Sequence, residues 1–213
     1  MTTSFAPRAP HHRSWSTIAA GSRALAAGEL VILSHHRRVV LVGCAYAATT
    51  EQMAFLIRHT TGFLQVALHE RICDRLVLPE ATPTVRATST LGHGQCVTVD
   101  AAAGTTTGIS GADRARTARI LADPATDSGD LTRPGHLVPV RVTPTEFRMR
   151  LTTASLALAL TDTAESHFSG AVFADLDGIA DPTSVGDRPD AEALADRYGL
   201  TLVAGPDLKD TIR

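Results

Sequence analysis

The sequence predicts an α+β fold, a layered α/β sandwich with a mixed β-sheet, and two observations lead to this prediction. Short apolar runs typical of buried strands alternate roughly with longer stretches of helical periodicity. The 213 residues are 44% hydrophobic and contain no clear linker or internal repeat. A chain of this size can enclose one substantial core, so we expect a single domain over residues 14–213.

Helix-capping and helix-ending residues delimit the elements expected in the first half of the chain. Gly28 ends a first helix, Pro79 ends a later one, and Thr49 and Gln52 have the capping-box spacing that opens a helix. After a disordered N-terminal arm at 1–13, we expect a helix at 16–28, strands at 30–33 and 39–47, a helix at 53–59, a strand at 63–68 and a helix at 69–78. The polar residues 34–38 are expected to connect the first two strands tightly.

Apolar periodicity delimits the elements expected in the second half. Leu151–Thr161 is strongly helical, and Ala171–Leu176 is typical of a buried strand. After a turn-rich segment at 80–94, we expect a strand at 96–100, a helix at 112–122, strands at 137–140 and 171–176 on either side of a helix at 151–161, a helix at 190–198, a strand at 200–203 and a short helix at 206–212.

Composition excludes several classes of partner. The net charge is −2 and there is no basic tract, which argues against nucleic acid or an anionic membrane. No apolar run is long enough to span a bilayer, and the N-terminus lacks the apolar region of a secretory signal. The three cysteines, Cys44, Cys73 and Cys96, are scattered, as is typical of a reducing compartment, so we expect a cytoplasmic protein.

The stretch from residue 104 to residue 141 carries the densest group of candidate site residues. Ser110 and Asp113 have capping-box spacing for the helix at 112–122, and Thr107 and Gly108 come just before them. Hydroxyls and free N–H groups at a helix start favour an anion such as phosphate, although a well-capped helix explains the same residues. Arg114, in the first turn of the helix, can point back into this pocket.

A second candidate group is the segment Arg133-Pro134-Gly135-His136. Proline and glycine favour a turn, which would place the arginine and the histidine just before the strand at 137–140. His136 can act as an acid or base near neutral pH, although a lone histidine is more often structural or solvated.

Two segments of this stretch, TTTGISGADR and DLTRPGHLVPVR, resemble the 3,4-dihydroxy-2-butanone 4-phosphate synthase (DHBP synthase) family of riboflavin-pathway lyases. The resemblance continues through EQMAFLIRHTTG and LTLVAGPDL and covers most of the chain. It implies a Mg²⁺-dependent homodimer with its active sites at the dimer interface. The family reaction converts ribulose 5-phosphate to 3,4-dihydroxy-2-butanone 4-phosphate and formate.

The resemblance also assigns residues by position. His136 and Asp175 are the expected catalytic residues, because they match the histidine of the family's Arg-Pro-Gly-His motif and a substrate-binding glutamate. Thr107 matches a substrate-binding threonine, and Arg148 and Thr152 match the family's Arg-Gly-Gly-His-Thr-Glu segment. The full set expected to bind the substrate or its anionic group is Thr107, Ser110, Asp113, Arg114, Arg133, Arg148 and Thr152.

The family's metal ligands do not carry over to this chain. The acidic first loop of the family corresponds to Ser34–Arg38, which has no carboxylate, and the histidine ligand falls at Leu151, or at Thr153 in a shifted frame. Because Mg²⁺ prefers carboxylate oxygens, we expect no metal cofactor. Two alternatives concern the same loop: its two histidines bind a different metal, or its two arginines supply positive charge where the metal would stand.

These observations favour a divergent DHBP-synthase-like enzyme. It would perform metal-independent lyase, isomerase or dehydratase chemistry on a small phosphorylated or carboxylated substrate, in a setting such as specialised metabolism. One alternative is a catalytically inactive protein that binds or regulates a partner such as an active paralogue. Another is the family reaction itself. The expected partners are a small-molecule substrate and a second copy of the chain, without nucleic acid or membrane.

Overall fold

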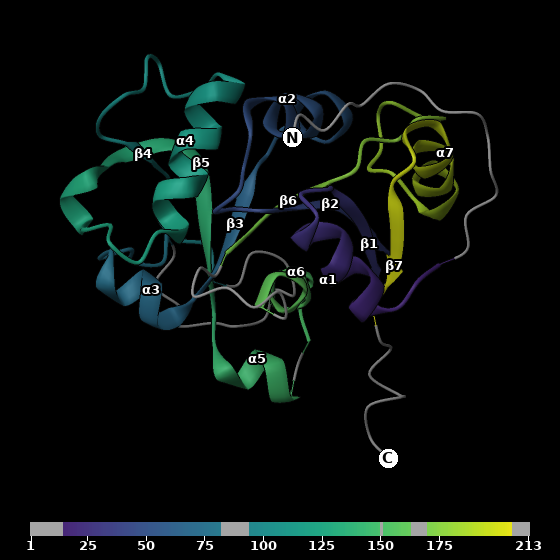
Figure 1. Cartoon of the computed structure of the whole chain (residues 1–213), viewed down its shortest axis with the longest axis horizontal. Helices are drawn as coiled ribbons and strands as arrows, with labels where there is room; N and C mark the ends of the chain where they lie inside the picture. Colours follow the sequence, from purple (N-terminus) through teal and green to yellow (C-terminus); the bar gives the residue numbers. More distant parts are fainter. Residues whose placement is uncertain (1–14, 82–93, 150, 163–169, 206–213) are drawn as a thin grey trace.

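The computed structural model describes residues 15–81, 94–149, 151–162 and 170–205, with no account of the side chains of 147–149 (Figure 1). The predicted N-terminal arm, the final helix at 206–212 and most of the turn-rich segment lie outside the described residues. The described strands form one sheet in the order β4-β5-β3-β6-β2-β1-β7. They are β1 (Val31–His35), β2 (Arg38–Cys44), β3 (Gln65–His69), β4 (Val99–Ala101), β5 (Leu131–Val142), β6 (Ala171–Asp175) and β7 (Thr201–Ala204).

The sheet is mixed, as the sequence predicts. Strands β1 and β7 are parallel, as are β3 and β5, whereas the other neighbouring strands are antiparallel. The described α-helices are α1 (Ile18–Ala26), α2 (Thr50–His59), α3 (Glu70–Arg75), α4 (Gly111–Ala122), α5 (Pro144–Met149), α6 (Thr153–Asp162) and α7 (Arg188–Tyr198), with a 3₁₀ turn at Ser128–Asp130.

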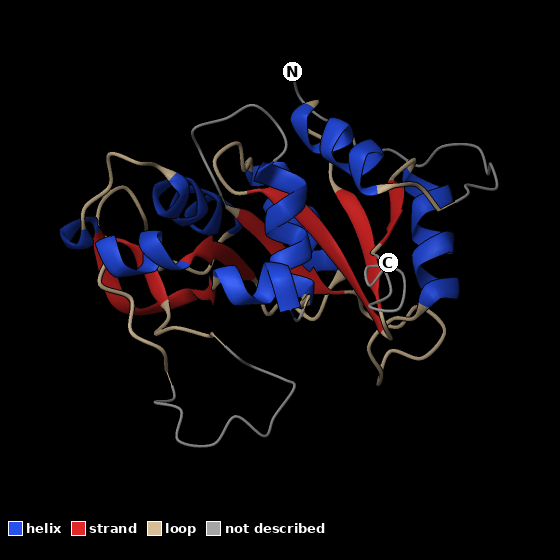
Figure 2. Ribbon diagram, turned by 90° about the horizontal axis from the view of Figure 1, so that it is seen from below, coloured by secondary structure: helices blue, strands red, loops and turns tan. Residues whose placement is uncertain are grey.

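Helices cover both faces of the sheet, which explains why its central strands are apolar almost throughout (Figure 2). Val31 and Leu33 of β1 pack on one face in a core that includes residues of α1 and α6. Ile32, between them, packs on the other face with residues of α2, α4 and α7. The α+β layered architecture predicted from the alternation of elements is therefore confirmed.

Local capping signals were reliable guides to helix starts. Thr49 accepts a hydrogen bond from the N–H of Gln52, and the Gln52 side chain accepts one from the N–H of Thr49, so the predicted capping box opens α2. Ser110 caps α4 by accepting from the N–H of Asp113 at 3.0 Å. The short helix α5 was not predicted, because its residues carry no clear apolar periodicity.

The polar residues 34–38 are mostly strand and not the loop that the sequence suggested. Ser34 and His35 belong to β1 and are buried, and His35 pairs with Arg38 at the start of β2. Only His36 and Arg37 form the turn, with His36 in the left-handed region (φ 53°). The first apolar run ends at Leu33, whereas the pairing of β1 with β2 continues to His35. Hydrophobicity alone therefore placed the end of β1 too early.

The segment Arg133–His136 lies within β5 as a bulge and not as a turn before a strand. The β4–β5 register passes from Val99–Leu137 directly to Asp100–Thr132, so the four residues 133–136 have no partner in β4. The β4 backbone presses on Gly135, where a Cβ would lie 2.0 Å from the carbonyl carbon of Val99. Glycine is therefore required here for close strand approach and not for a turn.

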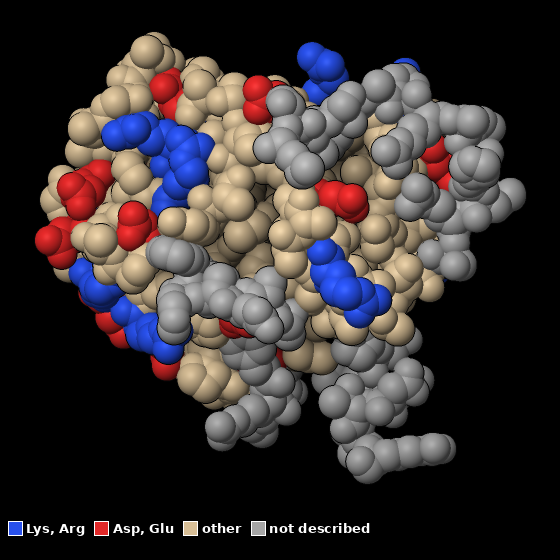
Figure 3. Space-filling view, viewed as in Figure 1, with Lys and Arg blue, Asp and Glu red and all other residues tan. Residues whose placement is uncertain are grey.

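Two surface properties bear on partners. Within the described ranges, no helix combines the length and apolar composition needed to cross a membrane. On the face shown in Figure 3, basic and acidic side chains of the described residues form small separate groups. This pattern differs from the continuous basic surface typical of nucleic-acid-binding proteins.

We expect Gly135→Ala to lower the free energy of unfolding by about 2–3 kcal/mol, because the added methyl group forces β4 and β5 apart. Gly129→Ala is the matched control, since nothing lies within 4 Å of a Cβ built there. The control should change stability by less than about 0.5 kcal/mol. Urea denaturation measures both variants, and equal stabilities would contradict the close approach at Gly135.

Candidate active site

The centre of the site is a pair of side chains, Asp100 on β4 and His136 on β5. Asp100 is 8% exposed and accepts a hydrogen bond from the backbone N–H of His136 at 2.9 Å through Oδ1. Its Oδ2 lies 2.7 Å from Nδ1 of the His136 ring. A carboxylate in this position orients the ring and favours the tautomer protonated on Nδ1. Nε2 is then the ring nitrogen that can accept a proton.

The loop containing Thr107 and Gly108 packs against this pair. Gly108 has φ 85°, and a Cβ there would lie 2.0 Å from Asp100 Oδ2 and 2.6 Å from His136 Nδ1. Both its backbone angle and its neighbours therefore require glycine. Thr107, one residue earlier, is exposed. The structure thus places the predicted substrate-binding threonine beside the predicted catalytic histidine.

Asp113 holds this loop in shape. Its carboxylate accepts hydrogen bonds from the hydroxyl (2.8 Å) and the N–H (3.1 Å) of Thr106 and from the N–H of Gly108 (3.1 Å). These donors, the Thr106 hydroxyl first, hold the pKa of Asp113 below its usual value. Only one half of the predicted capping box is present. Ser110 accepts from the N–H of Asp113, but the Asp113 side chain bonds to the loop instead of the N–H of Ser110. Ser110 and Asp113 therefore support the loop and the helix start.

Arg114 follows Asp113 in the first turn of α4, as the sequence suggested. It is 8% exposed, and its Nη1 donates to the carbonyl of Gly62 at 3.1 Å. Burial lowers its pKa, and the negative charge of Asp100 opposes that shift. Its Nε is buried without a hydrogen-bond partner among the described residues, so a ligand does not reach that atom in this structure. The guanidinium instead connects α4 to the segment that follows α2.

Strand order brings Asp175 to the same end of the sheet as His136. Gln65, which begins β3, pairs with Val138 of β5 on one side and with Phe173 of β6 on the other. His136 comes two residues before Val138, and Asp175 comes two residues after Phe173. The two predicted catalytic residues therefore lie near the start of β3, on either side of it.

Arg38 forms an ion pair with Asp175 that sequence analysis did not predict. Its Nε donates to Oδ1 at 2.9 Å and its Nη2 donates to Oδ2 at 2.6 Å, a two-pronged arrangement. The side chains are 37% and 22% exposed, respectively. Arg38 and Asp100 are the main site residues that sequence reasoning missed. The alternation of Asp100 with the buried Val99 was a weak signal, and no local pattern marked Arg38.

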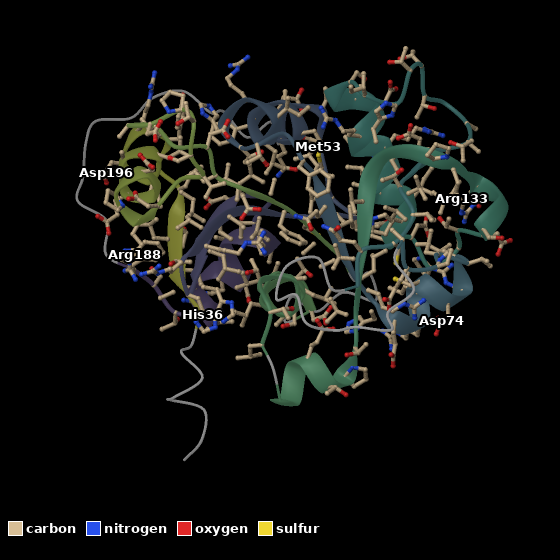
Figure 4. The ribbon with its side chains drawn as sticks, turned by 180° about the vertical axis from the view of Figure 1, so that it is seen from behind. His36, Met53, Asp74, Arg133, Arg188 and Asp196 are labelled. Carbon is tan, nitrogen blue, oxygen red and sulfur yellow. The ribbon has the colours of Figure 1, made fainter. Side chains whose placement is uncertain are left out.

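Other predicted residues have structural contacts. The Arg133 guanidinium donates to the carbonyls of Leu76 (2.7 Å), Leu131 (3.1 Å) and Ser128 (3.2 Å), so it anchors β5 to the end of α3 instead of lining the pocket. Figure 4 places Arg133 and His36 toward opposite sides of the molecule.

Two further predicted substrate-binding residues precede α6. Thr152 comes directly before the helix, and its hydroxyl accepts from the N–H of Ser155 at 3.0 Å. That contact makes it a helix cap. Arg148 belongs to α5, and its side chain lies outside the described residues.

The two adjacent histidines of the β1–β2 turn have ring centroids 4.1 Å apart, and His35 is buried. In the part of the chain that the structure describes, no group of three or more His, Cys, Asp or Glu side chains could hold a metal ion. The alternative that these histidines bind a different metal therefore gains no third ligand from the described residues.

Comparison with known proteins defines the class of this chain. Residues 20–211 match the family model for 3,4-dihydroxy-2-butanone 4-phosphate synthase. The crystal structure of that synthase from Candida albicans superposes with a TM-score of 0.80 at 29% identity, covering 93% of this chain and 98% of the other. The chain therefore belongs to the DHBP synthase family, lyases of riboflavin biosynthesis.

Curated relatives support the same family assignment. The riboflavin biosynthesis protein RibBA of Salinispora tropica is 40% identical over 168 residues, which cover 79% of this chain and 41% of the relative. RibBA of Mycobacterium tuberculosis is 37% identical over 191 residues, covering 86% and 44%. The chain thus spans less than half the length of these relatives. The match supports a DHBP-synthase-type function and gives no support to the divergent or inactive hypotheses.

The comparisons also correct the expectation that no metal cofactor is involved. A crystal structure of a DHBP synthase in complex with two magnesium ions superposes with a TM-score of 0.79 at 29% identity, covering 93% of this chain and 95% of the other. The prediction of no metal is therefore wrong for this family. The absence of carboxylates from the loop Ser34–Arg38 was not sufficient reason for that prediction, because a Mg²⁺ site can consist of one or two carboxylates completed by water and substrate oxygens.

The Asp113 contacts predict a pH-dependent contribution to stability. Because the pKa of Asp113 is lowered in the folded protein, its stabilising effect is present above the unfolded value of about 3.9 and is lost as the pH falls through the folded value. We expect Asp113→Asn to be less stable than wild type at pH 7, with the difference shrinking below about pH 4. Urea denaturation at several pH values measures this. Asp74→Asn, at an exposed carboxylate, is the control, and a pH-independent difference would contradict the assignment.

Proposed function

We propose that this chain converts ribulose 5-phosphate to 3,4-dihydroxy-2-butanone 4-phosphate and formate, with Mg²⁺ as cofactor. The observation that carries the proposal is the Asp100–His136 pair, against which the loop containing Thr107 and Gly108 packs, in a chain whose family match covers residues 20–211. The divergent reaction expected from the missing loop carboxylates is set aside, because the comparisons favour the family reaction.

The anionic end of the substrate is assigned to Thr107 and Arg114. The exposed Thr107 offers a hydroxyl, and Arg114 supplies a positive charge that acts on Asp100. The remaining carbons would then extend toward Asp175, which lies at the same end of the sheet with β3 between it and His136.

Proton transfer is assigned to His136. Its Nε2 would remove or return a proton at a substrate carbon or hydroxyl next to a carbonyl group. Asp100 would hold the tautomer with Nδ1 protonated and stabilise the imidazolium that forms. Asp175, at the other end of the site, would orient a substrate hydroxyl by accepting its hydrogen bond. Asp100 is thus a positioning residue, and His136 is the catalytic residue.

No described residue is assigned to hold the metal. Asp100 is engaged with His136, Asp113 with the loop, and both oxygens of Asp175 with Arg38. The bound ion would supply Lewis-acid polarisation of substrate oxygens.

We also propose a homodimer, as the family resemblance implies. Phe63 and Ile109 are large apolar residues that are 50% and 56% exposed, and they directly follow Gly62 and Gly108 of the site. Exposed apolar side chains beside a site are consistent with a second copy covering it. Localisation in the cytoplasm stays a prediction from the cysteine pattern.

The direct test is a formate-release assay on ribulose 5-phosphate. We expect the purified chain to release formate with Mg²⁺ and to lose activity in a chelator, with recovery on adding Mg²⁺ or Mn²⁺. Size-exclusion chromatography on the same sample reports whether a dimer is present. No formate with either ion would reject the proposed reaction and return attention to a different substrate.

We expect Asp100→Asn to lower kcat by about 10- to 100-fold while KM changes little, because Asp100 acts through His136 and does not touch the substrate. Asp74→Asn is the matched control, since Asp74 pairs with Arg141 at a distant, exposed position. Steady-state kinetics on both variants, with circular dichroism as a check on folding, separate the two parameters. A rise in KM at constant kcat would assign Asp100 to substrate binding instead.

A further inference from the structure

The ion pair of Arg38 and Asp175 connects the ends of two neighbouring strands whose backbones are fixed. Arg38 begins β2 and pairs with His35 of β1. Asp175 ends β6 and pairs with Val40 of β2. The carbonyl oxygen of Asp175 also accepts from the N–H of Thr61 at 2.9 Å. The backbone of Asp175 is therefore held on both sides, and the freedom that remains at this residue is the rotation of its side chain.

The guanidinium of Arg38 removes that rotation. Its Nε donates to Oδ1 of Asp175 at 2.9 Å and its Nη2 donates to Oδ2 at 2.6 Å. Two hydrogen bonds from a planar guanidinium fix the plane of a carboxylate, which a single bond or a point charge does not. In the part of the chain that the structure describes, no other side chain donates to this carboxylate. The orientation of the Asp175 carboxylate thus depends on Arg38.

The contact leaves Asp175 able to bind a ligand. Each carboxylate oxygen has two lone pairs that can accept hydrogen bonds, and Arg38 occupies one on each oxygen. The Asp175 side chain is 22% exposed. A hydroxyl group of a substrate can therefore donate to a carboxylate whose orientation is already fixed, which reduces the ordering cost of binding.

We propose that Arg38 is a positioning residue, which holds the Asp175 carboxylate in the orientation that accepts a hydroxyl group of the sugar phosphate. The inference rests on the proposed function, because it takes ribulose 5-phosphate as the substrate and Asp175 as the acceptor of its hydroxyl. Arg38 itself makes no contact with the substrate. Its effect on binding passes through Asp175, so the effect disappears when the Asp175 carboxylate is absent.

The test measures binding of ribulose 5-phosphate to the full chain by isothermal titration calorimetry, in a chelator that removes the Mg²⁺ of the proposed reaction. We expect Arg38→Gln to weaken binding by about ten-fold, because the carboxylate must then be ordered when the substrate binds. Arg38→Lys keeps the charge without the two-pronged contact, so its affinity should lie within about three-fold of that of Arg38→Gln. Arg37→Gln, at the exposed neighbouring position of the turn, is the matched control and should change affinity by less than about two-fold.

A double variant tests whether the effect passes through Asp175. In a chain that carries Asp175→Asn, adding Arg38→Gln should weaken binding by less than about two-fold. Circular dichroism and thermal unfolding of each variant establish that it is folded.

Five results would each overturn the inference. They are equal affinities of Arg38→Gln and wild type, wild-type affinity in Arg38→Lys, an equal loss in Arg37→Gln, no binding by the wild-type chain, and a loss that persists in the Asp175→Asn background. The last result would place Arg38 in direct contact with the substrate.

The outcome is distinguishable from that of the formate assay. Formate release by the wild-type chain together with unchanged affinity in Arg38→Gln supports the proposed reaction and rejects the role of Arg38. Weaker binding in Arg38→Gln that disappears in the Asp175→Asn background, without formate release by the wild-type chain, supports the role of Arg38 and rejects the proposed reaction.

Discussion

The Asp100 carboxylate is the contact on which the site depends, because it fixes both the main chain and the ring of His136. It lies at the irregular point of the β4–β5 pairing, where the backbone of β4 presses on Gly135. Gly108 approaches the same carboxylate from the other side. Glycine is therefore needed at both positions so that β4, β5 and the loop containing Gly108 can meet at Asp100. The strand irregularity and the glycine loop are parts of one arrangement.

The site extends from this carboxylate along one edge of the sheet. The central strands are buried on both faces, which holds the backbone that carries the site residues. A site built on such strands keeps its reacting groups in place. At the other side of β3, Asp175 is held by the two-pronged contact with Arg38.

Much of the fold was predictable from the sequence, because it rests on local signals. The capping box of Thr49 and Gln52 and the apolar runs of the strands placed elements close to their observed positions. Predictions failed where a polar segment continued a strand, as at Ser34 and His35, or where proline and glycine formed a bulge within a strand instead of a turn before it. In both cases a distant strand decided the local conformation. The sequence of a strand does not show which other strand it will pair with.

The sequence by itself determined the α+β class and the family resemblance, and it proposed His136, Thr107, Arg114 and Asp175 as site residues, because these follow from periodicity and from short motifs. Only the tertiary structure decided what these residues contact. Asp100 meets His136 across 36 residues of chain, and Arg38 meets Asp175 across 137. It also turned Arg133 and Asp113 from expected ligands into supports. The physical reason is that hydrogen bonds and ion pairs depend on distances of a few ångströms, which only the packed sheet establishes.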